Sequence, residues 1–139
     1  MRAALAAAVC ALALCPVAHA DPAHFTLGQP FVLAGGEEAT STDGAVRLRF
    51  AQVLEDSRCP ALVECFWSGR ARIAVVVEPA DAAPATVAFD TNPAPGTTVT
   101  TVRAGAYEVT LRSLDPYPQT PQDVIALRDY RATLLVSGP

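Results

Sequence analysis

Apolar residues at every second position constrain this chain more than any other feature of its sequence. In residues 46–50, valine, leucine and phenylalanine alternate with two arginines, and the clearest run of this kind covers residues 70–77. Successive side chains of a β-strand point to opposite faces, so a period of two predicts strands with one buried face. Shorter segments of similar character lie at residues 31–33, 87–89, 99–102, 107–112 and 130–136. The sequence therefore predicts an all-β fold of about seven to eight short strands.

Turn-forming residues separate these segments, including Gly35-Gly36, Asp43-Gly44 and Asp115-Pro116. Short strands spaced by such turns are typical of an antiparallel β-sandwich or a partly closed barrel with Greek-key-like connections. One helical turn is expected within residues 121–127. No linker divides residues 21–139, which are therefore expected to form a single β-domain. Its core is expected to contain the inward members of the alternating runs and the only tryptophan: Val46, Leu48, Phe50, Trp67, Ile73, Val75, Val109, Leu111, Leu134 and Val136.

The first twenty residues have the features of a bacterial signal peptide. Arg2 supplies a positive start, residues 3–14 form a short apolar run, and residues 18–20 read Ala-His-Ala, a cleavage site with small residues at both recognition positions. We therefore expect cleavage after Ala20 and a secreted or periplasmic protein. A lipoprotein that begins at Cys15 is the alternative, disfavoured because leucine precedes that cysteine. No later segment has the eighteen or so apolar residues that a membrane-spanning helix needs.

Charge and residue usage bear on partners and chemistry. The chain has ten basic residues, all of them arginine, against fourteen acidic ones. This acidic balance, with the arginines scattered, disfavours nucleic acid and anionic membranes as partners. Beyond residue 20 there is no lysine and only one histidine, His24, so a serine nucleophile lacks an obvious base. His24 would fall fourth after cleavage, near an end expected to fray, which disfavours a terminal copper site. We expect no enzyme activity, no metal and no cofactor.

Two cysteines remain after cleavage, Cys59 and Cys65. Export places them in an oxidising compartment, where such a pair usually forms a disulfide bond. In the chain-entropy description, closing so short a loop contributes about 2–2.5 kcal/mol. A zinc site would need further ligands beside two thiolates. The pair is therefore expected to be a local clamp.

The segment around these cysteines differs chemically from the rest of the chain. It has the pattern D-S-R-C-P followed by C-x-W-x-G-x-A, which is carried by Asp56, Ser57, Arg58, Cys59, Pro60, Cys65, Trp67, Gly69 and Ala71. This pattern resembles a group of small secreted bacterial proteins with no assigned activity. The resemblance covers about sixteen residues, with a looser similarity in the closing run that starts at Tyr130. It implies kinship, but it brings no substrate, cofactor or catalytic residue.

A structural role accounts for each residue of this motif. Trp67 is expected to cover the disulfide and bury its ring, and Gly69 to allow close backbone approach or a bulge. The side chains of Asp56 and Ser57 are expected to accept hydrogen bonds from backbone amides. Arg58 could fork onto Asp56 or onto Glu64, or donate to loop carbonyls. Pro60 is the remaining motif residue to which we assign a structural role.

A functional role is the alternative, because rigid loops often carry recognition. The candidate recognition residues are Arg58, Leu62 and Glu64, with residues 92–97, expected at the opposite end of the domain, as a second candidate surface. We expect an exported, non-enzymatic binding or accessory domain of the bacterial cell envelope, whose partner is an envelope or extracellular protein. An inhibitor of a secreted hydrolase, a protease or a lysozyme, that presents the 59–65 loop is the alternative. A small hydrolase that uses Asp56 and Glu64 as facing carboxylates is a third hypothesis.

Overall fold

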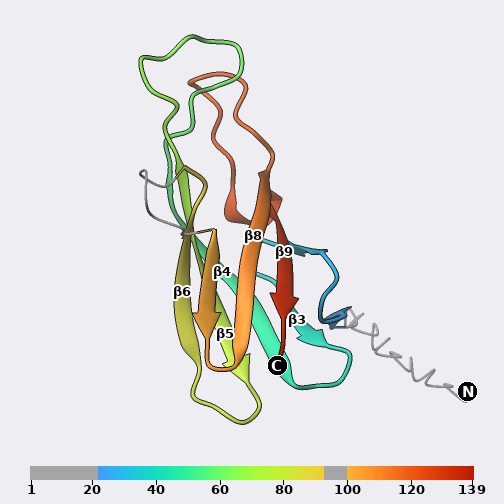
Figure 1. The fold of residues 1–139 in the computed structure, drawn as a ribbon. Helices are drawn as coiled ribbons and strands as arrows, with labels where there is room; N and C mark the ends of the chain where they lie inside the picture. Colours follow the sequence, from blue (N-terminus) through green and yellow to red (C-terminus); the bar gives the residue numbers. More distant parts are fainter. Residues whose placement is uncertain (1–21, 93–99) are drawn as a thin grey trace, which may run out of the picture.

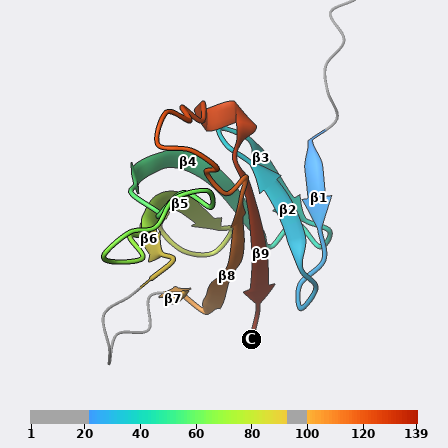
Figure 2. The same ribbon diagram turned by 90° about the horizontal axis from the view of Figure 1, so that it is seen from above.

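A computed structural model describes residues 22–92 and 100–139, which form two β-sheets packed face to face (Figures 1 and 2). One sheet has five strands in the order β1-β3-β4-β5-β6, and the other has four in the order β2-β9-β8-β7. The sheets do not close into a barrel, so the β-sandwich is the correct one of the two predicted architectures.

The strand bounds agree with the alternating segments, with two additions. The elements are β1 (Ala23–Phe25), β2 (Phe31–Ala34), β3 (Glu38–Ser41), β4 (Val46–Asp56), β5 (Ala71–Pro79), β6 (Ala85–Asp90), β7 (Thr101–Ala104), β8 (Tyr107–Asp115), the 3-10 helix η1 (Leu127–Asp129) and β9 (Arg131–Ser137). The sequence pattern did not predict β1 or β3. The expected frayed end is wrong for His24, which lies in β1 and pairs with Thr40 of β3 in parallel register. The helical turn lies at η1, later than the predicted residues 121–127.

The core forms between the inner faces of the two sheets. Val46, Leu48 and Phe50 of β4 are buried, and in register they pair with Pro79, Val77 and Val75 of β5. Such cross-strand apolar pairs stabilise a sheet and set its register. Every residue predicted to lie in the core is buried, except Trp67.

The order of the four-stranded sheet is Greek-key-like, because β7, β8 and β9 form a meander and the distant β2 lies beside β9. The hairpin of β7 and β8 turns at Gly105, which has a positive φ. In the described residues, every strand pair is antiparallel except β1 with β3. No helix in this part of the chain is long and apolar enough to span a membrane.

The topology brings two long loops to one end of the sandwich. The 57–70 loop leaves β4 and enters β5, and the 116–126 loop leaves β8 and leads through η1 into β9. Both lie at the top of Figure 1, the first in green and the second in orange. β-Bulges interrupt β4 after Phe50 and after Val53, and β8 after Leu111, as these strands approach that end. Bulges bend a strand and re-aim its side chains, and here they lie next to the loops that carry the motif.

Candidate functional site

The 57–70 loop and the 116–126 loop are joined by their backbones. The amide of Ala61 donates to the carbonyl of Pro118 at 3.0 Å, and the amide of Leu62 donates to the carbonyl of Gln119 at 3.0 Å. Since the two loops come from different sheets, these bonds fasten the sandwich at this end. We call the two loops together the clamped end.

Arg58 lies at the centre of the clamped end. Its Nε and Nη2 donate to the two carboxylate oxygens of Asp56 at 2.8 and 2.7 Å. Its Nη1 donates to the carbonyl of Leu114 at 2.8 Å, and Nη2 also donates to the carbonyl of Pro116 at 3.0 Å. One guanidinium therefore joins the end of β4 to the end of β8 in the other sheet. Bidentate pairing of this kind is the strongest hydrogen-bond geometry that arginine offers.

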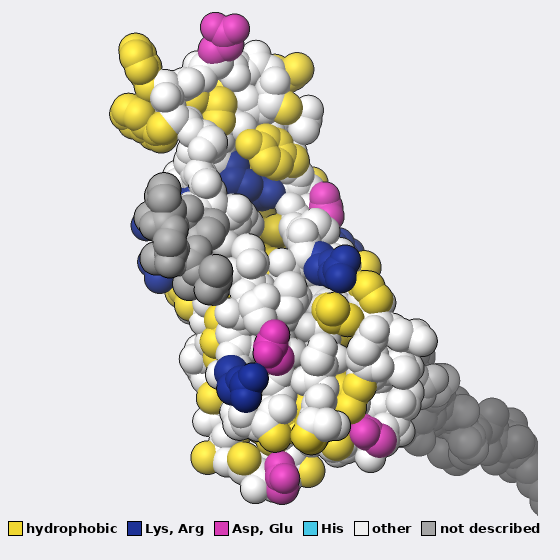
Figure 3. Space-filling view, viewed as in Figure 1, with side chains coloured by type: hydrophobic (Ala, Val, Ile, Leu, Met, Phe, Trp, Pro, Cys, Tyr) yellow, Lys and Arg dark blue, Asp and Glu magenta, His cyan; other side chains and the backbone are white. Residues whose placement is uncertain are grey.

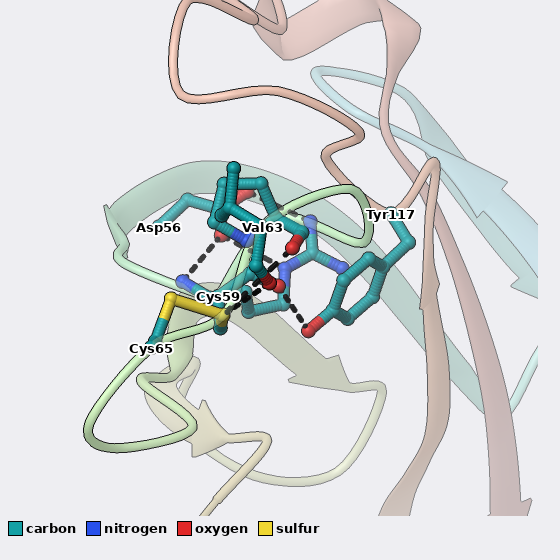
Figure 4. The surroundings of a disulfide bond; sticks show 7 residues. Asp56, Cys59, Val63, Cys65 and Tyr117 are labelled. Atoms are coloured by element: carbon teal, nitrogen blue, oxygen red, sulfur yellow. Dashed lines mark hydrogen bonds and ion pairs between the residues drawn. A yellow bond between two sulfur atoms is a disulfide. The ribbon is translucent and has the colours of Figure 1, made fainter.

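Two tyrosines complete this cluster, Tyr130 buried and Tyr117 partly exposed. The hydroxyl of Tyr130 donates to Oδ2 of Asp56 at 2.8 Å. The hydroxyl of Tyr117 donates to the carbonyl of Cys59 at 2.8 Å, and its ring lies 5.0 Å from Cζ of Arg58 (Figure 4). A guanidinium over an aromatic face is attracted by the ring quadrupole. The closing Tyr130 is thus part of the same structural unit as the cysteine motif, far away in sequence.

The electrostatics of this cluster favour the charged pair. Burial by itself would raise the pKa of the Asp56 carboxyl, but hydrogen bonds from Arg58 and Tyr130 and the charge of Arg58 outweigh it, so that pKa lies below its ordinary value. Burial likewise opposes the charge of Arg58, yet Asp56 holds the pKa of Arg58 above its ordinary value. Burial and the hydrogen bond to Asp56 raise the pKa of Tyr130 to about 12. Asp56 is therefore a fixed anion, which is a poor general acid.

The predicted disulfide is present between Cys59 and Cys65, whose Cα atoms are 6.0 Å apart. Beside it, the amide of Cys59 donates to the carbonyl of Ser68 at 2.9 Å, and the amide of Ser57 donates to the carbonyl of Arg70 at 2.7 Å. The first and last residues of the 57–70 loop therefore lie side by side before β5 begins. The predicted clamp is confirmed, and these backbone bonds extend it.

The smaller motif residues hold the loop through contacts with the backbone. Asp56 accepts from the backbone amide of Arg58 at 3.4 Å, and the hydroxyl of Ser57 accepts from the amide of Arg70 at 3.3 Å. Gly69 has φ +63°, and a Cβ built there would lie 1.8 Å from the carbonyl oxygen of Ser57. Only glycine fits both the backbone angle and this close approach. The carbonyl of Pro60 accepts from the amide of Val63 at 3.2 Å, which closes the turn inside the disulfide loop.

The prediction that Trp67 is buried against the sulfurs is wrong, because its surface is 79% exposed. The backbone bonds at Ser57 and Cys59 bring the two sides of the loop together at its base, so residues 60–67 project beyond the ends of the strands. Neither sheet offers an inner face there. The core is filled without the tryptophan.

The three predicted recognition residues differ in their exposure to solvent. Leu62 and Glu64 are exposed, as expected of surface residues. Arg58 is only 7% exposed, and its guanidinium is engaged by Asp56 and by carbonyls of the β8 end. Of the partners proposed for Arg58, Asp56 and backbone carbonyls are correct. Most of its surface is therefore covered, because the bidentate pair with Asp56 holds it inside the molecule.

The second candidate surface, residues 92–97, was expected at the end of the domain opposite the 59–65 loop. This expectation is wrong for Asn92, which lies at the clamped end. Its side-chain amide donates to Oγ of Ser68 at 2.6 Å and to the carbonyl of Gly69 at 2.9 Å. Strand β6 runs antiparallel to β5 and so returns to the clamped end. Residues 93–97 lie outside the described residues.

Sequence reasoning missed Phe66, which is fully exposed. Its ring lies beside that of Trp67, with centroids 6.4 Å apart. With Leu62 and Val63 they form a group of exposed apolar side chains that we call the apolar tip. Figure 3 shows hydrophobic side chains gathered on this projecting end of the molecule. The signal in the sequence is the pair of adjacent aromatic residues that directly follows Cys65.

Two kinds of group bear on whether the clamped end can do chemistry, metal ligands and free carboxylates. In residues 22–92 and 100–139, no three His, Cys, Asp or Glu side chains gather in a way that could hold a metal ion. A groove of about 480 Å³ runs beside Arg58, Ser68, Asn92 and Tyr117. The Asp56 carboxylate, on which the third hypothesis depends, is occupied by Arg58 and Tyr130.

Comparisons with protein-family models, with curated proteins and with solved structures find no match to this chain.

Proposed function

We propose that this protein is an exported, non-enzymatic binding domain of the bacterial cell envelope, which recognises an envelope or extracellular protein through the apolar tip. The single observation that carries the proposal is the full exposure of Phe66, next to a largely exposed Trp67, on a loop that is fastened at its base. Large apolar groups gathered on a surface usually mark an interaction site.

The architecture under the tip supports this proposal. The disulfide, the Arg58 cluster and the bonds to the 116–126 loop hold the backbone on which the tip is mounted. A preorganised loop loses little conformational entropy on binding, so more of its contact energy becomes affinity. Aromatic residues are also the types that most often dominate binding energy.

Asp56 is the reason to favour binding over catalysis. The third hypothesis needs Asp56 as one of two facing carboxylates, one of them acting as an acid. The side chains of Arg58 and Tyr130 donate three hydrogen bonds to this carboxylate and so occupy it, which suits a structural anion better than a nucleophile or an acid.

Site-specific photo-crosslinking in the producing cell tests the proposal. A photoreactive phenylalanine analogue replaces Phe66 in one variant and Ala83 in a matched control. Ala83 is exposed in the turn after β5, at the end of the sandwich opposite the clamped end. We expect an adduct with one exported protein at position 66 only, abolished by excess unlabelled wild-type protein. Equal adducts at both positions, or none at 66, would contradict recognition by the tip.

Intact-mass measurement tests the export part of the proposal separately. We expect the purified protein to begin at Asp21 and to gain the mass of two hydrogens on reduction. A mass that includes acyl chains at Cys15 would instead establish a lipoprotein.

A further inference from the structure

The two aromatic residues of the apolar tip lie between two points that are both attached to Cys59. On one side, Cys65 is bound to Cys59 through the disulfide. On the other side, the carbonyl of Ser68 accepts from the amide of Cys59 at 2.9 Å. Phe66 and Trp67 are therefore the middle of a short bridge whose two ends share one anchor.

A side chain that lies just beyond β6 holds the second end of this bridge more firmly. The amide of Asn92 donates to the hydroxyl of Ser68 at 2.6 Å and to the carbonyl of Gly69 at 2.9 Å. Asn92 follows β6, so this contact ties the bridge to the five-stranded sheet. The bridge is thus held at both ends while its central side chains point into solvent.

The small size of the tip selects a concave partner. A buried aromatic side chain covers roughly 150–250 Å², whereas a stable flat interface covers about 800 Å² on each partner. Two projecting rings reach high affinity only where a pocket encloses them, in the manner of a binding hot spot. A partner with a deep apolar pocket therefore fits this tip better than a second flat surface.

The charges around the tip disfavour a lipid surface. The basic residues of the 57–70 loop are Arg58, which is buried, and Arg70, whose guanidinium pairs with Glu55 at 3.4 Å and with Asp90 at 3.1 Å. The 116–126 loop has no basic residue, and the two loops also carry the acids Glu64 and Asp123. Anionic membranes are bound by clusters of exposed basic residues, which this end lacks.

We propose that Phe66 enters the primary specificity pocket of a secreted serine endopeptidase that prefers aromatic residues, and that the protein thereby inhibits this enzyme. This inference rests on the proposed function and names the class of partner. The pocket of such an enzyme is a deep apolar slot that encloses one aromatic ring. A single fully exposed phenylalanine on a rigid, projecting bridge is the shape that it accepts.

The shared anchor also explains why the loop would inhibit the enzyme rather than be consumed by it. Attack of the catalytic serine oxygen on the Phe66 carbonyl carbon forms an ester and breaks the Phe66–Trp67 C–N bond. The enzyme's histidine carries the serine proton to the leaving nitrogen, which becomes the Trp67 amine. Ser68 stays bonded to Cys59, and Cys65 stays attached through the disulfide, so this amine remains beside the ester. Its return re-forms the peptide bond and releases the serine, because an amine held in place has a high effective concentration.

Inhibition assays with defined enzymes test this inference. The full-length chain is expressed for export in a bacterial host, and the purified oxidised protein is titrated against chymotrypsin and subtilisin with a chromogenic peptide substrate. We expect competitive inhibition that Phe66→Ala weakens at least 100-fold at an unchanged melting temperature. The matched control Val32→Ala, which changes an exposed residue of β2, should inhibit as wild type does.

A specificity exchange makes the test independent of folding. Trypsin has an acidic pocket that takes arginine, so Phe66→Arg should inhibit trypsin and lose inhibition of chymotrypsin. Ala83→Arg, with its arginine at the opposite end of the sandwich, should not inhibit trypsin and should still inhibit chymotrypsin.

Several results would overturn the inference. The first is that the wild-type protein inhibits neither chymotrypsin nor subtilisin. The second is that inhibition survives Phe66→Ala, and the third is that the enzyme rapidly and completely cleaves the chain after Phe66. Binding to phosphatidylcholine vesicles, seen as a blue shift of Trp67 fluorescence, would assign the tip to a bilayer instead. If inhibition fails while the crosslink at position 66 persists, the proposed function holds and only this partner class is wrong. If the crosslink also fails, both are wrong.

Discussion

The hydroxyl of Tyr130 donates to the carboxylate of Asp56 at 2.8 Å, which joins the last residue of β4 to the residue that precedes β9. These strands belong to different sheets. Asp56 in turn receives both arms of the Arg58 guanidinium, which also reaches the end of β8. The two sheets are therefore fastened to each other at this end by a polar cluster, in addition to the apolar core between them.

The first prediction concerns Arg58. Arg58→Ala leaves the partly buried carboxylate of Asp56 without its partner and the carbonyls of Leu114 and Pro116 without their donor. Breaking a buried pair from one side costs about 3–5 kcal/mol of unfolding free energy, and we expect the low end because the Asp56 side chain is 14% exposed. Urea denaturation measures this change.

The control for Arg58 is an arginine whose ion pair lies in solvent. Arg47 pairs with Glu78 on the outer face of β4 and β5, and its side chain is half exposed. Exposed pairs contribute about 0–1 kcal/mol, so Arg47→Ala should change stability by less than about 1 kcal/mol. Equal losses for the two variants would contradict the central position of Arg58.

The second prediction is a loss of stability in acid that depends on Asp56. Its pKa is lowered in the folded state, so the folded protein binds its proton less readily than the unfolded chain does. The resulting stabilisation is complete above about pH 5. It decreases as the pH falls through the ordinary carboxyl pKa of about 3.9, and it is lost once the pH is below the folded-state pKa. Asp56→Asn should make the unfolding free energy less steep between about pH 5 and pH 2, as urea titrations at each pH would show. An unchanged slope would mean that other carboxyls control acid unfolding.

The sheets could be predicted from the sequence because their signal is local and repeated. The alternation of residues 46–50 and 70–77 depends on burying one face, and the structure buries that face. By contrast, β1 and β3 are three and four residues long, too short to show a period, and their pairing depends on contacts between distant segments.

The clamped end could be predicted only in part, for a physical reason. The disulfide and the fork from Arg58 to Asp56 join residues close in sequence, so their chemistry suggests the contacts. The bonds from Arg58 to Leu114 and from Tyr130 to Asp56 span 56 and 74 residues and depend on the packing of two sheets. The burial of Arg58 depends on these distant contacts, whereas the exposure of Trp67 follows from the backbone bonds at the base of the loop. Both contradict what residue type alone favours.

The third prediction compares two glycines with similar backbone angles. Gly69 has φ +63° and Gly44 has φ +71°, but a Cβ at Gly69 meets the Ser57 carbonyl whereas a Cβ at Gly44 meets nothing within 4 Å. Gly44→Ala should therefore cost only the left-handed backbone term, about 1–2 kcal/mol. Gly69→Ala must also move the backbone and should cost about 3 kcal/mol or more. Similar melting temperatures for the two variants would contradict the close approach at Gly69.

The fourth prediction concerns the disulfide. Replacing Cys59 and Cys65 together by serine should lower the unfolding free energy by about 2–2.5 kcal/mol, the chain-entropy value for so short a loop. The fold should survive, because the backbone bonds of Cys59 and Ser57 and the Arg58 cluster remain. Circular dichroism and urea denaturation of the double variant check both statements. Complete unfolding would show that the bridge, and not the polar cluster, is the main support of the loop.

The last prediction uses the only tryptophan as a reporter of the apolar tip. Trp67 is 79% exposed, so Trp67→Ala should change the unfolding free energy by less than about 0.5 kcal/mol, the usual range for surface substitutions. A buried ring would instead cost about 3–5 kcal/mol. With excitation selective for tryptophan, all emission comes from this one side chain. This emission should be red-shifted and readily quenched by iodide in the native protein, because the ring is exposed. A blue-shifted, protected emission in the free protein would place the ring against the domain, and the apolar tip could not then present it to a partner.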